Sequence, residues 1–411
     1  MGALINMSKA VPAFIHEEIL RARAITDRLF AQVLPDALYE RPIPERHRLI
    51  FYVGHLEAFD WNLIGKSFLG LNPIDPALDS VFAFGIDPTP GALPQDKATD
   101  WPELFQVRRY VARIRSSLDT TVNQANEHVL RMALEHRLMH AETLTYLIHN
   151  LPYSKRLTRM RGAHSSAGAS GHEFITIPAG SVSLGLKRGE GFGWDNEFEF
   201  HQRDVEGFSI TKYKVTNGQY LQFVRDGGPV PHYWIERGDE FRYRGFHGEV
   251  PLPTDFPVFV SYVQAEAYAK WMNKAVPTES QFHRAAFGTD SQFERPYPWG
   301  QDSPRQEVGN FDFSSFEPLP VTSHPAGNSA FGVSQMMGNG WEWTSSEFAP
   351  FPGFRREPLY PGYSADFFDG DHHVVKGASC ATDHLLMRRS FRNWFRVSYP
   401  YAYTSFRLVE N

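Results

Sequence analysis

The sequence has very little cysteine, since Cys380 is the only one among its 411 residues. A single thiol cannot form an intrachain disulfide, which fits a reducing, cytoplasmic compartment. We expect Cys380 to be a small buried side chain rather than a nucleophile. The chain also has no run of 18 apolar residues, so we expect no membrane-spanning helix. We also do not expect its N-terminal residues to act as a secretory signal.

Neither sign of charge dominates, since 47 acidic residues face 41 basic ones. The formal net charge is −6, without a long run of like charges, and we therefore expect no nucleic-acid partner. The sequence contains no internal repeat and no low-complexity tract. Its 411 residues are enough for two or three domains.

Two histidines lie one helical turn apart where core-facing side chains are expected. The segment around them carries an apolar stripe with steps of three or four residues, which is the spacing of one helix face. The stripe consists of Leu118, Val122, Ala125, Val129, Met132, His136, His140, Thr143 and Leu147. Imidazoles four residues apart on one face converge on a single point, which suits a metal ion. A metal would also satisfy two buried polar rings at once.

A third histidine, His55, lies on another predicted helix, over residues 51–63. The apolar stripe of that helix is Tyr52, His55, Phe59 and Leu63. Three inward histidines from two helices can form a facial triad with open positions, which suits non-haem Fe(II), with Zn(II) as the alternative. Glu57 and Glu142 are candidate carboxylate ligands, although Glu142 points away from His140 and is expected to have a supporting role. The competing interpretation is that each histidine is a hydrogen-bonded core residue.

Residues 13–152 are expected to be helical. The first helix carries its apolar face at Ile15, Ile19, Ala22, Ile25, Leu29 and Val33. The second helix contains His55 and is followed by a loop over residues 85–102 that is rich in proline and glycine. The third and fourth helices are predicted at about 103–117 and 119–150. Four such helices make a bundle, which is a frequent setting for metal sites.

The chain changes character after residues 157–172, which are rich in small and polar residues and are expected to form a linker. Beyond it, short strands, aromatic residues and turn residues dominate. A strand with its turn and two helices are predicted at 174–180, 261–274 and 278–287. We therefore divide the chain into a bundle (1–156), the linker and a second domain (173–411).

The second domain contains a recognisable motif at residues 332–344, Gly-Val-Ser-Gln-Met-Met-Gly-Asn-Gly-Trp-Glu-Trp-Thr. It resembles the hallmark of the sulfatase-modifying-factor domain, which has a C-type-lectin-like fold. Further blocks of that domain are matched by residues 195–197, 213–217, 277–281 and 405–408. Formylglycine-generating enzymes of this fold bind copper through a cysteine pair, so a single cysteine rules out that activity.

The helical half resembles a DinB-like four-helix bundle through His136, His140 and Glu142. The two halves together resemble the ergothioneine-type sulfoxide synthases over nearly the whole chain. The expected fold class is therefore α+β, with an N-terminal DinB-like four-helix bundle and a C-terminal C-type-lectin-like domain of the formylglycine-generating-enzyme type.

This resemblance implies an activity and a set of site residues. The family holds Fe(II) with three histidines, here His55, His136 and His140, and uses O2 to join the imidazole C2 of hercynine to a donor sulfur. Asn393 and Trp394 would face the trimethylammonium group of hercynine. That group has no N–H to donate, so aromatic faces and polar oxygens are its available partners. The competing interpretation is that Trp394 belongs to the core.

A tyrosine of the family delivers a proton or a hydrogen atom. Tyr363, within residues 361–368, resembles it, while Tyr360 is a competing candidate. The loop length differs from that of the family. A packing role for Tyr363 is therefore the alternative.

Three positions depart from the pattern of the synthases that use gamma-glutamylcysteine. Phe395 stands where they have Asp, Met139 stands where Gln is frequent, and the loop at 85–102 lacks their arginines. A dicarboxylate peptide would therefore have no cationic clamp. We predict a selenosugar donor, as in the selenoneine synthases that resemble this architecture. Ergothioneine sulfoxide synthesis from cysteine or another thiol is the alternative.

Two functions of other classes also fit parts of the sequence. A Zn-dependent thiol transferase or hydrolase of the DinB type would need the histidines but would not consume O2. A glycan-binding lectin with an inert bundle would leave the three inward histidines without a purpose.

Overall fold

The computed structural model describes residues 13–83, 93–157 and 171–410. The chain forms two compact units, Met1–Thr158 and Arg159–Asn411, and each is described by itself. Most of the expected linker at 157–172 and the first part of the loop at 85–102 lie outside the described residues.

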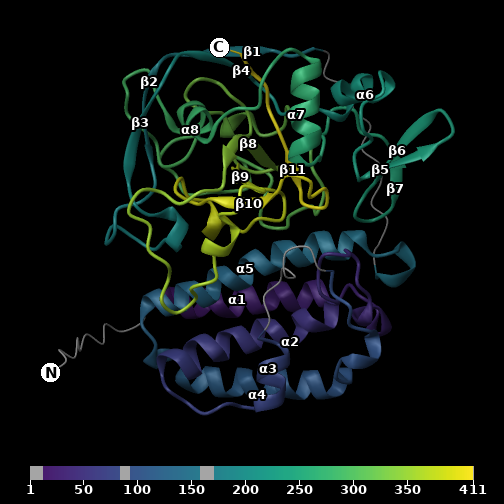
Figure 1. Cartoon of the computed structure of the whole chain (residues 1–411), viewed down its shortest axis with the longest axis vertical. Coiled ribbons are helices and arrows are strands. Elements are labelled where there is room, and N and C mark those ends of the chain that lie inside the picture. Colours follow the sequence, from purple (N-terminus) through teal and green to yellow (C-terminus); the bar gives the residue numbers. More distant parts are fainter. Residues whose placement is uncertain (1–12, 84–92, 158–170, 411) are drawn as a thin grey trace. The chain divides into compact units, whose positions relative to one another are not determined.

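Within the described residues, the first unit contains four long helices, which pack as a bundle (Figure 1). These are α1 (Ala13–Phe30), α2 (Leu49–Asp60), α4 (Leu104–Thr121) and α5 (Glu127–Asn150). Helix α1 packs on α5, and α2 packs on both α4 and α5. A π-helical segment (Trp61–Phe68) extends α2, and the short helix α3 (Pro76–Val81) precedes α4. The four-helix bundle expected from the sequence is confirmed.

The boundaries of the last two helices differ from the prediction. Helix α4 continues to Thr121, and α5 begins only at Glu127, because a turn separates them. The side chain of Asn126 caps α5 by accepting a hydrogen bond from the backbone N–H of Val129 (3.0 Å), as expected for an N-cap residue. Leu118, Val122, Ala125 and Val129 are all buried. The apolar spacing therefore continues across the turn, and the spacing alone cannot predict where α4 ends and α5 begins.

The first helix is also shorter than its apolar stripe suggests. Helix α1 ends at Phe30, and Val33 instead forms an isolated β-bridge with Arg156. Both residues are buried. Val33 is apolar because it is buried and not because it is helical. The apolar spacing therefore predicted a helix that is too long.

The second unit combines short strands with a few helices (Figure 1). Its main sheet has the order β10-β9-β8-β11, in which β8 and β9 are antiparallel and β11 is parallel to β8. The strands of this sheet are β8 (Trp341–Glu347), β9 (His372–Lys376), β10 (Asn393–Arg396) and β11 (Thr404–Ser405).

Three smaller sheets accompany it, with the orders β1-β4-β12, β2-β3 and β5-β6-β7. Their strands are β1 (Phe174–Ile177), β2 (Gly180–Leu184), β3 (His201–Val205), β4 (Phe208–Thr211), β5 (Trp234–Arg237), β6 (Glu240–Arg244), β7 (Glu249–Pro251) and β12 (Val409–Glu410). The predicted strand at 174–180 corresponds to β1.

The α-helices in the described part of this unit are α6 (Asn217–Arg225), α7 (Tyr262–Trp271) and α8 (Glu279–Phe287). Each begins with a capping box, in which a Ser or Thr side chain and a Gln three residues later bond to each other's backbone N–H. The sequence predicted α7 and α8 but missed α6, although Thr216 and Gln219 carry the same signal.

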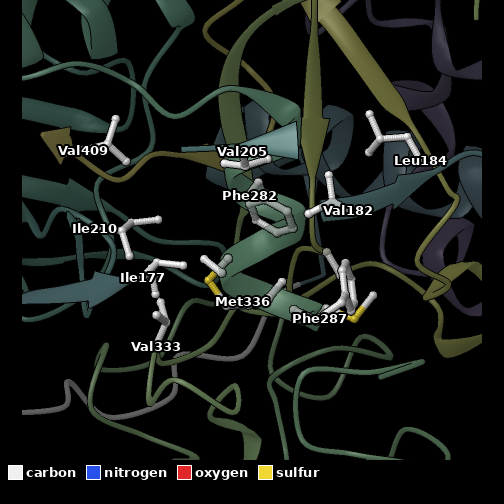
Figure 2. Packing of buried hydrophobic residues seen from close by; sticks show 14 of the residues in the cluster. Ile177, Val182, Leu184, Val205, Ile210, Phe282, Phe287, Val333, Met336 and Val409 are labelled. Carbon is white, nitrogen blue, oxygen red and sulfur yellow. The ribbon is translucent and has the colours of Figure 1, made fainter. Parts of the chain in front are cut away.

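The core of the second unit forms around α8, as Figure 2 shows. Phe282 and Phe287 of α8 pack against apolar side chains from several strands and loops. Those labelled are Ile177, Val182, Leu184, Val205, Ile210, Val333, Met336 and Val409. Burial of this kind contributes about 1.5–3 kcal/mol for each large side chain.

Motif residues of the second unit form a buried ion network. Glu342 of β8 binds both Lys214 and Arg407, and all three side chains are 0% exposed. Arg407 also donates to the backbone carbonyl of Thr211 (3.1 Å). Gly338 adopts a φ of +90°, and a Cβ there would lie 2.9 Å from the carbonyl oxygen of Asn310. These motif positions therefore stabilise the fold.

Candidate active site

The three predicted histidines come together in the bundle. Their ligand nitrogen atoms all lie within 4.8 Å of one another. His55 comes from α2, whereas His136 and His140 lie one turn apart on α5. The Nε2 atoms of His136 and His140 are 3.1 Å apart. All three side chains are buried, so the triad forms a preorganised nitrogen cluster inside the bundle.

Neighbouring groups hold the orientation of these rings. Nδ1 of His55 lies 2.7 Å from the carbonyl oxygen of Phe82, so Nδ1 carries the proton and Nε2 keeps its lone pair. Phe51 stacks on His55 at 4.6 Å between ring centroids. Phe59 stacks on His136 at 3.4 Å, with an interplanar angle of 11°.

The electrostatics of the cluster favour neutral imidazoles. Burial lowers the pKa of His55 to about 4. Burial, followed by the neighbouring imidazoles, lowers the pKa of His136 and of His140 well below the usual value. Neutral imidazole is the form that binds a metal. The triad is therefore ready to act as a ligand set at neutral pH.

The donor set fits a divalent transition metal. Nδ1 of His140 is buried without a hydrogen-bond partner among the described residues, and its Nε2 faces the Nε2 of His136. Imidazole nitrogens are suitable ligands for iron and zinc alike. His55, His136 and His140 would hold such an ion.

The carboxylates considered as ligands lie elsewhere. Glu57 forms ion pairs with Arg115 (2.7 Å) and Arg137 (2.9 Å), and Arg137 also binds Asp60 (2.6 Å). In the described chain, neither Glu57 nor Glu142 belongs to the histidine cluster. The candidate role of Glu57 as a ligand is therefore wrong, because its arginine partners hold it.

Sequence reasoning missed this ion network. Arg137 is only 2% exposed and joins α5 to the carboxylates of α2, while Arg115 of α4 extends the network to Asp27 of α1 (2.8 Å). The available signal was an arginine between His136 and Leu138, in a buried part of the helix. It predicts a buried partner but cannot identify it.

In the second unit, the structure brings Tyr363 and Trp394 into contact. Their rings meet edge to face with centroids 5.4 Å apart. Phe348 stacks on Trp394 at 4.2 Å and 8°, and Phe367 lies 5.5 Å from it. Trp194 stacks on Tyr363 at 4.0 Å. We call these five residues the aromatic cluster.

Tyr363 is held from several sides. Its side chain is buried, and the next residue, Ser364, donates a hydrogen bond to Asp195 (2.6 Å). Burial raises the pKa of Asp195. The competing candidate, Tyr360, is 5.9 Å from Tyr363 and more exposed.

Phe395 belongs to a different set of side chains. It stacks on Tyr399 at 5.6 Å and 2°, and it meets Trp343 at 6.4 Å. Successive strand residues point to opposite faces, so Trp394 and Phe395 of β10 face different surroundings. The side chain of Asn393 accepts a hydrogen bond from the backbone N–H of Trp394 (2.9 Å).

The last predicted residue, Met139, lies on α5 beside His140 and is partly exposed. Its carbonyl oxygen accepts a hydrogen bond from Thr143 (3.2 Å). The predicted site residues thus form three groups. They are the triad next to Met139, then Tyr363 and Trp394 of the aromatic cluster with Asn393 beside them, and finally Phe395, which pairs with Tyr399.

The fold and these groups can be compared with known proteins. Residues 161–411 match the family of the sulfatase-modifying factor enzyme 1-like domain. Hercynine oxygenase of Mycobacterium tuberculosis is 33% identical over 321 residues, which cover 72% of this chain and 75% of that protein. Ergothioneine biosynthesis protein 1 of Schizosaccharomyces pombe is 26% identical over 94% of this chain and 54% of its own length.

A helical bundle with a histidine triad, fused to a sulfatase-modifying-factor domain, defines a class of two-part proteins. The chain belongs to the ergothioneine-type sulfoxide synthase family. The expected fold class, with its C-type-lectin-like C-terminal domain, is confirmed. The formylglycine-generating enzyme of Streptomyces coelicolor is a more distant relative, at 27% identity over 54% of this chain and 82% of that protein.

None of the described helices is both long and apolar enough to cross a bilayer.

Proposed function

We propose that this chain is a non-haem Fe(II)- and O2-dependent synthase that joins a donor sulfur to the imidazole C2 of hercynine. The observation that carries the proposal is the buried triad of neutral imidazoles, in a chain 33% identical to a hercynine oxygenase. The main alternative in the same family uses selenium as the joining atom.

His55, His136 and His140 would hold Fe(II) through three neutral imidazoles. The bound ion would supply the activation of O2 and of the donor sulfur. The overall reaction is balanced: hercynine C–H, a thiol R–SH and O2 give a C–S bond, an S=O group and one water. The walls of the triad, Phe51 and Phe59, are apolar and exclude bulk water from His55 and His136.

The aromatic cluster suits the trimethylammonium group of hercynine. A quaternary ammonium is attracted to aromatic faces and needs no hydrogen-bond acceptor. Phe348 already covers one face of Trp394, so the contact would use its other face with the rings of Phe367 and Tyr363. Asn393, which directly precedes Trp394 in the chain, offers polar side-chain atoms to the same group.

Tyr363 is the proposed proton or hydrogen-atom donor. Trp194 stacks on its ring and Trp394 meets its edge, so its position is fixed beside the proposed hercynine contact. A fixed donor avoids the cost of reorganisation during the reaction. Tyr360 is not held in this way by Trp394.

The donor is proposed to be cysteine or another small thiol rather than gamma-glutamylcysteine. The described part of the loop at 85–102 contains no arginine. Arg41 and Arg48, which reach this part of the loop, are already engaged, because both bind the side chain of Asp96. The second carboxylate of gamma-glutamylcysteine, which cysteine lacks, would have to lose water without either of these arginines as its partner.

A selenosugar remains the second candidate, since Phe395 and Tyr399 form a parallel aromatic pair against which a sugar ring could lie. The names of the relatives favour the sulfur reaction. Mass spectrometry of products from hercynine, O2 and each donor tests both. We expect a sulfoxide product from cysteine and little from gamma-glutamylcysteine. A clear preference for the selenosugar would establish the second candidate instead, and absence of any hercynine product would refute both.

A further inference from the structure

A surface cavity of about 450 Å³, open to solvent, lies beside α3 and the first half of α4. This volume is in the range of small-molecule sites. The lining includes Asp75, Leu78, Asp100, Trp101, Arg109 and Arg113. None of the histidines of the triad lines it, so the cavity is distinct from the candidate active site.

Arg109 gives the cavity an available positive charge. Its side chain is exposed and has no hydrogen bond or ion pair in the described structure. Arg113 lies one turn further along the same face of α4. By contrast, Arg113 donates to the carbonyl oxygen of Ile74 (2.6 Å) and lies 4.0 Å from a carboxylate oxygen of Asp75.

Two carboxylates balance these cations. One oxygen of Asp75 caps α3 by accepting from the backbone N–H of Leu78 (3.2 Å). One oxygen of Asp100 accepts from the backbone N–H of Lys97 (2.7 Å), which leaves its other oxygen available. A simple anion would face both carboxylates and a simple cation would face both guanidinium groups. A molecule with both charges complements the lining.

Trp101 adds apolar surface between these charges. Its indole N–H donates to Asp96 (2.7 Å), which anchors the ring, and the residue stays partly exposed. The indole is 5.9 Å from Phe51, whose ring stacks on His55. The cavity wall is therefore continuous with the packing that holds one ligand of the triad.

We infer that this cavity binds a small zwitterion of the amino-acid type. Its carboxylate would pair with Arg109, its ammonium with Asp100, and its apolar or aromatic body would lie against Trp101. Charge-assisted hydrogen bonds to a guanidinium and to a carboxylate are the strong ones among protein hydrogen bonds. The inference depends on the bundle alone and not on the proposed reaction.

The test uses the full-length protein labelled with 5-fluorotryptophan and observed by fluorine NMR. The signal of Trp101 among the nine tryptophans is assigned with the Trp101→Phe variant. The probes are L-phenylalanine, phenethylamine, which lacks the carboxylate, and 3-phenylpropanoate, which lacks the ammonium group. None of them carries an imidazole or a thiol that would compete for the metal.

We expect L-phenylalanine to shift the Trp101 signal and to bind roughly tenfold or more tightly than either fragment. Arg109→Ala should weaken its binding by a similar factor. Arg108→Ala, which removes the neighbouring exposed arginine outside the lining, should not. Asp100→Asn should abolish the preference over 3-phenylpropanoate. The other tryptophan signals show whether each variant is folded.

Equal binding of L-phenylalanine and 3-phenylpropanoate would overturn the inference in favour of an anion site. Equal effects of Arg108→Ala and Arg109→Ala, or no shift of the Trp101 signal, would overturn the cavity as a binding site. Turnover of hercynine is not needed for any of these outcomes. Failure of the inference is therefore distinguishable from failure of the proposed function.

Discussion

The Nε2 atoms of His136 and His140 lie 3.1 Å apart on one face of α5. In this arrangement one metal ion can accept the lone pairs of both Nε2 atoms, so that neither buried ring is left without a partner. The third nitrogen donor comes from His55 on α2. The first predictions therefore concern this triad.

Replacing any one histidine of the triad by alanine should weaken Fe(II) binding by roughly tenfold or more, because losses of that size follow even from changes around a ligand. His128→Ala is the matched control, since His128 is exposed on the same helix. Metal content after equilibration with Fe(II) under argon measures the effect. Full iron occupancy in all three triad variants would show that the triad is not the metal site.

The affinity of the folded protein for the metal should change little between pH 7 and about pH 5.5. In the fold, the pKa of His55 is lowered to about 4, so protons compete with the metal only as the pH approaches that value. An exposed histidine site would lose affinity from about pH 6.5 downward. Titration with Co(II) at several pH values checks this, and a tenfold loss by pH 6 would contradict it.

The same shifts should make the metal-free protein less stable in acid. Between about pH 6.5 and pH 4 the unfolded chain binds a proton at His55 and the folded chain does not, so the free energy of unfolding falls as the pH falls. Each such histidine contributes up to about 1.4 kcal/mol per pH unit. Urea unfolding across this range measures the slope. His55→Asn should reduce the slope of the free energy of unfolding against pH. An unchanged slope would refute the lowered pKa of His55.

Arg137→Met should lower the free energy of unfolding by about 3–5 kcal/mol, because it leaves the buried carboxylates of Glu57 and Asp60 without their shared partner. Arg131→Met on the same helix is the control. It removes an exposed pair with Glu127 and should cost about 0.3–0.5 kcal/mol. Urea unfolding measures the loss of free energy of unfolding in both variants. Equal losses would mean that the buried pairs of Arg137 stabilise the fold no more than the exposed pair of Arg131.

Trp394→Ala should raise the KM for hercynine roughly 30-fold, the equivalent of the about 2 kcal/mol of a desolvated cation–π contact. Phe395→Ala should leave this KM nearly unchanged, because Phe395 packs with Tyr399 and Trp343 instead. Histidine, which lacks the trimethylammonium group, should be a much poorer substrate. Equal turnover of histidine and hercynine would exclude the proposed contact.

The triad could be predicted from sequence because a helix repeats every 3.6 residues and core-facing positions can be counted. His55 joins His136 and His140 because the core-facing sides of α2 and α5 pack against each other. The turn between α4 and α5 could not be predicted in the same way, since the buried positions continue across it. Asn126, the cap residue, was the one local sign.

Other parts of the site depend on contacts that no spacing reveals. The partners of Arg137 lie on α2, far from it in sequence, so its charge predicted a partner without naming one. Trp394 and Phe395 are adjacent in the sequence, although strand alternation places their side chains on opposite faces once β10 is known. Tyr363 meets Trp394 through the packing of a loop on a strand, which has no periodic signature.

The most direct test of the central claim follows the imidazole C2 of hercynine by carbon NMR. The full-length protein loaded with Fe(II) is supplied with hercynine labelled at C2, cysteine and O2. We expect the C2–H signal to be replaced by that of a sulfur-substituted carbon, only in the presence of O2 and not with His140→Ala. An unchanged C2 signal, or the same product from the Zn(II)-loaded protein under argon, would contradict the proposed function.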